Sequence, residues 1–143
     1  MLDSSLIQEN KRSWADMIDF VESFPTDDTW HAWKTFVRSV LRQGIDSGLD
    51  QYFRAGQSMQ HIIFSTAAHH GLEDMDPAPP RVTIAFDKQM HIYLAWSRSN
   101  LWFNEPNRKV SLTCSNAHGM LRIYLSSLWD ETRPSEPNPI SAA

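Results

Sequence analysis

The chain contains a single cysteine, Cys114, among its 143 residues. One cysteine cannot form a disulfide within the chain, so a fold that depends on such bridges is excluded. Small secreted domains commonly need disulfides, whereas proteins of reducing compartments do not. The sequence also lacks the basic segment and apolar run of a secretory signal. We therefore expect a cytoplasmic protein.

Long hydrophobic runs are missing as well. No stretch approaches the ~20 apolar residues of a membrane-spanning helix, so no membrane partner is expected. The five glycines form neither a GxxxxGK nor a GxGxxG pattern, and no HExxH, CxxC or i, i+4 histidine pair is present. The sequence therefore predicts no nucleotide-type cofactor and no metal. With 13 basic against 17 acidic residues and a net charge of -4, nucleic acid is not expected as a partner.

Tryptophan, in contrast, is abundant, with six residues. Large aromatic rings supply core area and also anchor interfaces. Their number suggests that the protein binds a large partner or a second copy of itself. The length fits one domain, which can bury about two-thirds of its unfolded surface without a disulfide or metal.

Two helices are predicted near the N-terminus. The first runs from Ser4 to Phe24, because Pro25 disfavours helical geometry in the residue before it. The second follows a cap at Thr26 or Asp27 and ends at about Gln43, with Gly44 as its stop. The expected inward positions are Trp14, Met17, Ile18 and Val21 in the first helix and Trp30, Trp33, Val37, Val40 and Leu41 in the second. Basic residues at positions 34, 38 and 42 are expected to face the acidic first helix, and the alternative is that they hold a phosphate or an acidic partner.

Residues 46–71 have the period of a third helix, with Asp46 or Ser47 as its cap and Gly71 as its end. Its last turn would hold His69 and His70. One face of this helix is polar throughout and carries Asp50, Arg54, Gln57, Ser58, His61, Ser65 and His69. A strand over residues 61–66 is the alternative, because that segment is rich in β-branched residues.

A hairpin is predicted after the acidic, proline-rich segment 73–80. Alternation over residues 82–86 and 90–96 predicts two strands, and a turn over 87–89 would pair Phe86 with Met90. Strands at 101–103 and 109–114 follow, and Ser115 or Asn116 caps a last helix. The expected architecture is α+β: three N-terminal helices, an antiparallel sheet of three or four strands, and a C-terminal helix packed on the sheet. This domain covers residues 1–132, and residues 133–143 form a flexible, proline-rich tail.

The polar helix face is the first candidate site. Ser65 and His69 are four residues apart, and a serine beside a histidine is the arrangement of nucleophilic catalysis. Arg54 and His61 on the same face could hold an anionic substrate. No carboxylate is placed to orient His69, however, and no glycine elbow surrounds Ser65. The sequence therefore favours a protein that is not an enzyme.

The outer sheet face is the second candidate site. Ala85 and Ala95 alternate there with His91 and Tyr93, which suits a partner surface, and Trp102 points away from its two apolar neighbours. The sequence thus predicts a non-catalytic protein–protein interaction module, such as a small acidic inhibitor, immunity-type or adaptor protein, that forms a homodimer. The alternative is a small-molecule-binding protein or hydrolase-like enzyme that uses the polar helix face. The candidate contact residues are Arg54, Gln57, Ser58, His61, Ser65, His69, His91, Tyr93 and Trp102.

Overall fold

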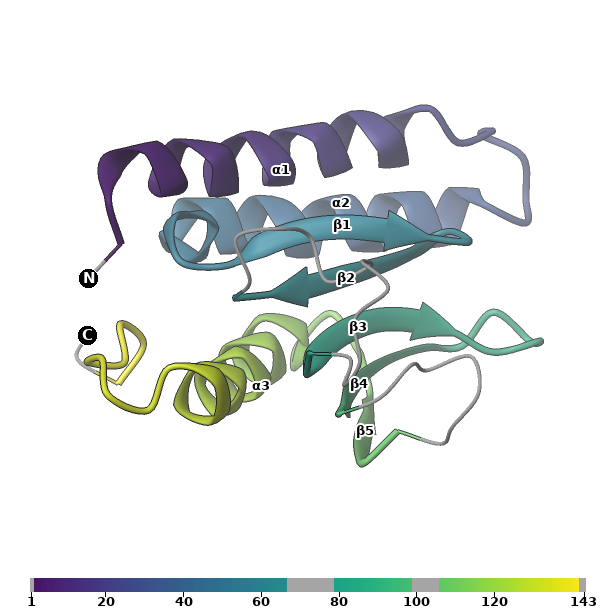
Figure 1. Cartoon of the computed structure of the whole chain (residues 1–143). Helices are drawn as coiled ribbons and strands as arrows, with labels where there is room; N and C mark the ends of the chain where they lie inside the picture. The colour runs from purple at the N-terminus through teal and green to yellow at the C-terminus, as the bar shows by residue number, and fades with distance from the viewer. Residues whose placement is uncertain (1, 67–78, 99–105, 142–143) are drawn as a thin grey trace.

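The computed structural model describes residues 2–66, 79–98 and 106–141 (Figure 1). Its elements in chain order are α1 (Ser4–Glu22), α2 (His31–Asp46), the short 3-10 helix η1 (Leu49–Gln51), β1 (Arg54–Ser58), β2 (His61–Ser65), β3 (Arg81–Phe86), β4 (Ile92–Ser97), β5 (Arg108–Ser111) and α3 (Ala117–Thr132). The strands form one open antiparallel sheet in the order β1-β2-β3-β4-β5. The α+β class is confirmed, but with two N-terminal helices in place of three and five strands in place of three or four.

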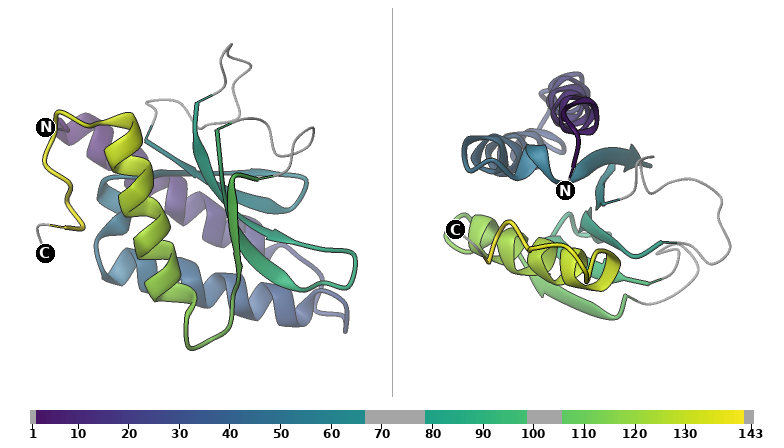
Figure 2. Two further views of the ribbon diagram at one scale, coloured as in Figure 1. Left: turned by 90° about the horizontal axis from the view of Figure 1, so that it is seen from below. Right: turned by 60° about the vertical axis from the view of Figure 1, so that its left-hand side comes forward.

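All three helices lie on one side of the sheet (Figure 2). α1 and α2 run side by side next to β1 and β2, while α3 packs on β3 and β4. The core fills the space between these layers. Its largest fully buried side chains are Trp14, Trp33, Phe53, Phe64, Leu41, Ile62, Ile84, Leu94, Leu121, Leu125, Leu128 and Val21. Burial of such apolar surface is the main force that holds the layers together.

α1 begins with a side-chain cap, because Asp3 Oδ1 accepts a hydrogen bond from the Leu6 amide at 2.8 Å. The predicted cap of the second helix at Thr26 or Asp27 is wrong, since the N-cap of α2 is Trp30, which makes no side-chain cap hydrogen bond. Asp27 Oδ1 instead accepts from the Trp30 amide at 3.1 Å in the turn before the helix.

The interpretation of Gly44 as a helix stop is wrong, because α2 continues through it to Asp46. A Cβ atom at Gly44 would lie 2.5 Å from Trp14 Cζ3, so glycine is needed there for the close approach of α1. The left-handed residue after the helix is Gly48, with φ 85°.

The predicted third helix is wrong, and the alternative of a strand near residues 61–66 is the correct one. The chain forms the β1–β2 hairpin instead, with Arg54 opposite Ser65 and Ser58 opposite His61. Its two-residue turn has positive φ at both Met59 (48°) and Gln60 (70°). This geometry matches the twist of the strands, but Asn-Gly is its usual sequence and Met-Gln is not.

The β3–β4 hairpin keeps its predicted faces but not its predicted turn. Phe86 pairs with Ile92 rather than with Met90, so five residues connect the strands. Asp87 causes this, since its Oδ1 accepts from the amides of Gln89 and His91, both at 2.9 Å. The shift by two residues leaves every side chain on the expected face, because side chains alternate with a period of two.

The last helix is confirmed. α3 ends at Thr132, and the following residues contact it: Asn138 Nδ2 donates to Ser126 O at 3.1 Å, and Ile140 packs against the core. Whether residues 133–143 are flexible stays a prediction. The expected helix end at 67–71, the loop over 73–78 and the strand at 101–103 lie outside the described residues.

The tryptophans that the structure describes are mostly core residues. Trp14, Trp33, Trp96 and Trp129 are each at most 4% exposed, and Trp30 is half-buried. Tryptophan abundance therefore reflects the interior of this fold more than an interface. None of the helices in the described part of the chain combines the length and apolar character needed to cross a bilayer.

Two glycine variants test the packing of α1 on α2. Replacing a glycine inside a helix by alanine ordinarily stabilises it by about 1 kcal/mol. We expect Gly44→Ala to lower the free energy of unfolding by about 1–3 kcal/mol instead, because the added methyl group collides with Trp14. Denaturant unfolding followed by tryptophan fluorescence measures the change.

Gly119→Ala is the matched control. Gly119 lies in α3, and nothing is within 4 Å of a Cβ atom built there. This variant should raise the free energy of unfolding by about 0.5–1 kcal/mol. A Gly44→Ala protein as stable as Gly119→Ala would contradict the packing described here.

Candidate functional site

The nine candidate residues separate in space. His69 and Trp102 lie outside the described residues. Because the predicted polar helix face is a hairpin, Arg54 and Ser65 become cross-strand neighbours at its open end, and Ser58 and His61 become neighbours at its turn. Of the other candidates, Gln57 lies in β1, Tyr93 lies in β4, and His91 directly precedes β4. The expected ridge is therefore divided between the two ends of one hairpin.

His61 belongs to an aromatic cluster at the turn end. Its ring is 4.7 Å from that of Phe86, which contacts Trp30 and Trp33 in turn. The residue is 8% exposed, and burial lowers the pKa of its imidazole from the ordinary value. A neutral ring packed among aromatic residues supports a structural role for His61. Within the described residues, no three potential metal ligands come together.

A polar row crosses the other end of the sheet, on the face away from the helices. Arg54 pairs with Ser65, and Arg81 pairs with Ser97. The β2–β3 register sets Phe64 opposite Val82, so one residue further it sets Ser65 beside Arg81. Arg81 and Ser97 were missed by the sequence interpretation, since cross-strand neighbours leave no local period in the sequence.

This outer face is less open than expected. Thr83, Ala85, Ala95 and Ser97 are each at most 2% exposed. The face becomes accessible towards the β3–β4 turn and the β5 edge, where Tyr93 is half-buried and His91, Lys109 and Ser111 are exposed. The accessible part of the outer face is therefore its end near His91, Tyr93 and β5.

The β1 edge of the sheet is covered by α1. The Ala55 amide points away from β2 and donates to Ser13 Oγ at 2.9 Å. Asn10 Nδ2 donates to Gln51 O at 2.9 Å just before the strand. The helix thus supplies the hydrogen-bond partners that an edge strand otherwise leaves open.

The β5 edge is open. Within residues 2–66, 79–98 and 106–141, no strand pairs with its outer side. The Leu112 amide donates to Ile92 O at 3.0 Å, so in an antiparallel ladder Val110 also bonds to β4 while Lys109 and Ser111 point their amides outward. One outward group is partly satisfied, because Asn116 Nδ2 donates to Ser111 O at 3.0 Å.

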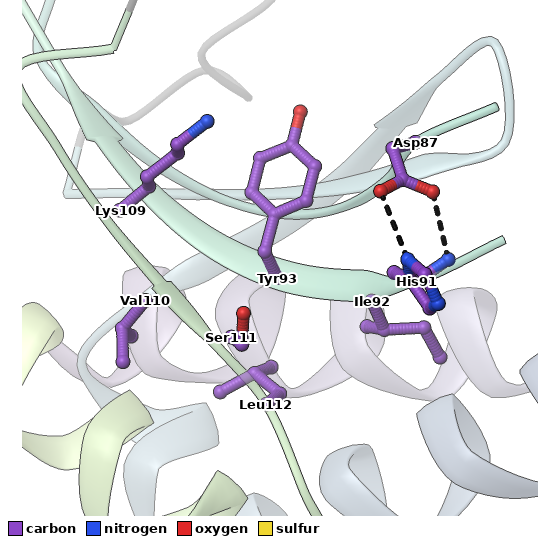
Figure 3. A pocket seen from close by; sticks show the side chains of 8 residues that line it. All are labelled: Asp87, His91, Ile92, Tyr93, Lys109, Val110, Ser111 and Leu112. Atoms are coloured by element: carbon purple, nitrogen blue, oxygen red, sulfur yellow. Dashed lines mark hydrogen bonds and ion pairs between the residues drawn. The ribbon is translucent and has the colours of Figure 1, made fainter. Parts of the chain in front are cut away.

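A pocket of about 700 Å³ lies beside this edge (Figure 3). Its lining consists of Asp87, His91, Ile92, Tyr93, Lys109, Val110, Ser111 and Leu112. Asp87 holds the turn at one end, where its Oδ2 lies 3.3 Å from His91 Nδ1, within hydrogen-bond distance. These hydrogen bonds from His91 and Gln89 keep the pKa of the Asp87 carboxyl below its ordinary value. The pocket therefore has a fixed acidic end and a basic end at Lys109.

Arginine stacking gives β5 a defined orientation. The Arg108 guanidinium lies 5.5 Å from the ring of Trp96 and 5.1 Å from that of Tyr124, and its Nη2 donates to Ser127 Oγ at 2.8 Å. Arg108 is thereby directed toward α3, on the helix side of the sheet. Lys109 lies on the opposite face, with its Nζ 5.7 Å from the Tyr93 ring. The backbone between them remains accessible.

Comparison of the chain with protein-family models, with curated proteins and with solved structures found no match. The functional assignment therefore depends on the geometry of this chain.

The burial of His61 predicts a pH dependence of stability. Since its pKa is lowered in the folded state, the unfolded chain binds the proton more readily. The free energy of unfolding should be fully maintained above the ordinary histidine pKa of about 6.5 and should fall as the pH drops below it. Thermal unfolding measured from about pH 7.5 down to about pH 5 should show this decline in stability. The decline should be smaller in the His61→Gln variant.

His118 contributes with the same sign, because burial and then the charge of Arg122 lower its pKa. The variant His118→Gln measures that separate share. An NMR titration of His61 itself with a midpoint at or above the ordinary histidine pKa would contradict the assignment.

Proposed function

We propose that the protein is a non-catalytic, cytoplasmic interaction module that self-associates by joining the β5 strands of two copies into one continuous sheet. The observation that carries this proposal is the contrast between the two edges. β1 is covered by α1, whereas β5 presents the amides of Lys109 and Ser111 to the outside. Strand addition at an open edge is a common mode of protein recognition.

The sequence of β5 favours one register between two copies. A two-fold axis through Val110 would pair Lys109 of each copy with Ser111 of the other, and these are the outward-facing residues that can exchange hydrogen bonds. It also avoids placing Lys109 directly opposite its own copy, which would be destabilising. Arg108 does not interfere, since Trp96 and Tyr124 hold it toward α3.

The pocket beside the edge extends this contact surface. It adds the half-buried ring of Tyr93 and the apolar side chains of Ile92 and Leu112 to a strand of only four residues. A stable dimer buries about 1,200–2,000 Å² in total, which strand pairing alone does not reach. We therefore propose that side chains of the second copy enter the pocket.

The burial of the candidate catalytic groups supports a non-catalytic role. Ser65 is 1% exposed, so a substrate has little access to its hydroxyl group. His61 is directed into the aromatic cluster and is kept neutral there. Neither residue has the accessibility that a nucleophile or a general base requires.

Lys109→Pro tests the self-association. Proline removes the outward amide of Lys109 but no hydrogen bond to β4. The change removes two intermolecular hydrogen bonds per dimer, worth about 1 kcal/mol each, so we expect the dimer dissociation constant to rise about 30-fold. Sedimentation velocity from micromolar to submillimolar protein measures this constant.

The control is Lys109→Thr, which removes the same charge but keeps the amide and suits a strand. It should leave the dissociation constant within a factor of about three, an uncertainty of less than 1 kcal/mol. A wild-type protein that is monomeric over the whole range would overturn self-association. Equal dimerisation of wild type and Lys109→Pro would place the interface elsewhere.

A further inference from the structure

A second pocket lies between α2 and the start of α3, and we call it the α2 pocket. It has a volume of about 490 Å³. Its lining consists of α2 residues between His31 and Gln43 together with Cys114, just before α3, and Ala117, the first residue of α3. None of these residues lines the pocket beside β5. What the α2 pocket binds is therefore independent of self-association through β5.

The floor of the α2 pocket belongs to the hydrophobic core. Val40 and Ala117 are each 2% exposed, and the half-buried Phe36 packs against the core from α2. Most of the pocket surface is apolar. Contact between apolar surface and water is unfavourable, so a ligand that covers this floor is stabilised by the same effect that holds the core together.

Polar side chains run along one side of this floor. Thr35, Ser39 and Gln43 follow one another at intervals of four residues, so they lie on one face of α2, and we call them the α2 row. All three residues are exposed, and their side chains make no hydrogen bond to other described residues. The α2 row can therefore bond to a ligand without first breaking a hydrogen bond within the protein.

The charge of the lining restricts the class of ligand. Among the described residues that line the α2 pocket, none is aspartate, glutamate, lysine or arginine. A charged ligand that enters the pocket would lose water without gaining an ion pair, which is costly. The lining therefore favours a neutral ligand.

The dimensions restrict the ligand further. From His31 to Gln43, a rise of about 1.5 Å per residue makes the α2 wall about 18 Å long. A partner helix of that length and a diameter of about 10 Å would occupy about 1,400 Å³, far more than the pocket offers. Pockets for small molecules have about 300–1,000 Å³. The α2 pocket is therefore long and narrow and has the size of a small-molecule site.

We propose that the α2 pocket binds a neutral, elongated small molecule with an apolar body and a hydroxyl or carbonyl group. The apolar body covers Phe36, Val40 and Ala117. The hydroxyl or carbonyl group forms a hydrogen bond with the α2 row. This division into a large apolar contact and a few orienting polar groups is typical of small-molecule sites.

Cys114 makes occupancy of the α2 pocket measurable. It is the only cysteine of the chain, it is exposed, and it lines the pocket, so a bound ligand shields its thiol. The probe is octanol, a neutral unbranched molecule with one hydroxyl group, whose dissociation constant is measured by calorimetry. At about ten times that constant, octanol should slow the alkylation of Cys114 by iodoacetamide about tenfold, because about a tenth of the pockets stay empty.

Ala32→Trp is the blocking variant, since Ala32 is exposed and lines the α2 pocket. The indole should fill the pocket, so the ratio of the alkylation rates without and with octanol should fall to about one. Ala15→Trp is the matched control, because Ala15 is also an exposed helical alanine but does not line the pocket. This variant should keep the full protection of Cys114.

Octanoate tests the neutral character of the ligand. It has the same chain as octanol but ends in a carboxylate, so its dissociation constant should be at least about tenfold higher. The proposal is overturned if octanol leaves the alkylation rate of the wild-type protein unchanged, or if octanol protects Ala32→Trp and Ala15→Trp equally. Octanoate that binds as tightly as octanol would also overturn it, because the pocket would then accept a charged ligand.

Discussion

The contact between Trp14 and Gly44 is the constraint on which the rest of the structure depends. The missing side chain of Gly44 lets the indole lie directly against α2. The same indole donates from Nε1 to Phe53 O at 2.8 Å, and its ring lies 4.9 Å from that of Phe64. One side chain of α1 thus fixes α2, the entry into β1, and β2. Because a buried donor without a partner is costly, this position of the indole is strongly specified.

The two edges of the sheet follow from this constraint. With Trp14 in place, the preceding residue of α1, Ser13, accepts a hydrogen bond from the Ala55 amide and so covers the β1 edge. Among the helices that the structure describes, none accompanies the outer edge of β5, whose neighbour α3 contacts the sheet through Tyr124 and Ser127 on the inner face. The proposed association by strand addition therefore uses the β5 edge and not the β1 edge. The polar row around Arg81 lies on the outer face, away from the helices.

The sequence predicted those parts of the fold that depend on local patterns. The spacing of apolar residues such as Trp14 and Val21 was sufficient for α1, α2 and α3, and the alternation through Ile84 and Leu94 was sufficient for the faces of β3 and β4. The helix predicted over residues 46–71 was wrong because the polar positions there happen to follow a helical period. The turn at Met59 and Gln60 also lacks the residues that usually mark a two-residue hairpin turn. Gly44 resembled a helix end, although a residue 30 positions away explains it. Of the polar row on the outer face, the sequence predicted Arg54 and Ser65 as candidate contact residues. Arg81 and Ser97 were not predicted, because only cross-strand pairing brings them next to these two.

Hydrogen–deuterium exchange at single backbone amides tests the central claim, one closed edge and one open edge, most directly. At protein concentrations where the chain is monomeric, the Ala55 amide should exchange slowly and the Lys109 amide rapidly, although both belong to edge strands. At concentrations that favour the dimer, exchange at Lys109 should slow while exchange at Ala55 stays unchanged. Slow exchange at Lys109 in the monomer, or rapid exchange at Ala55, would contradict the account.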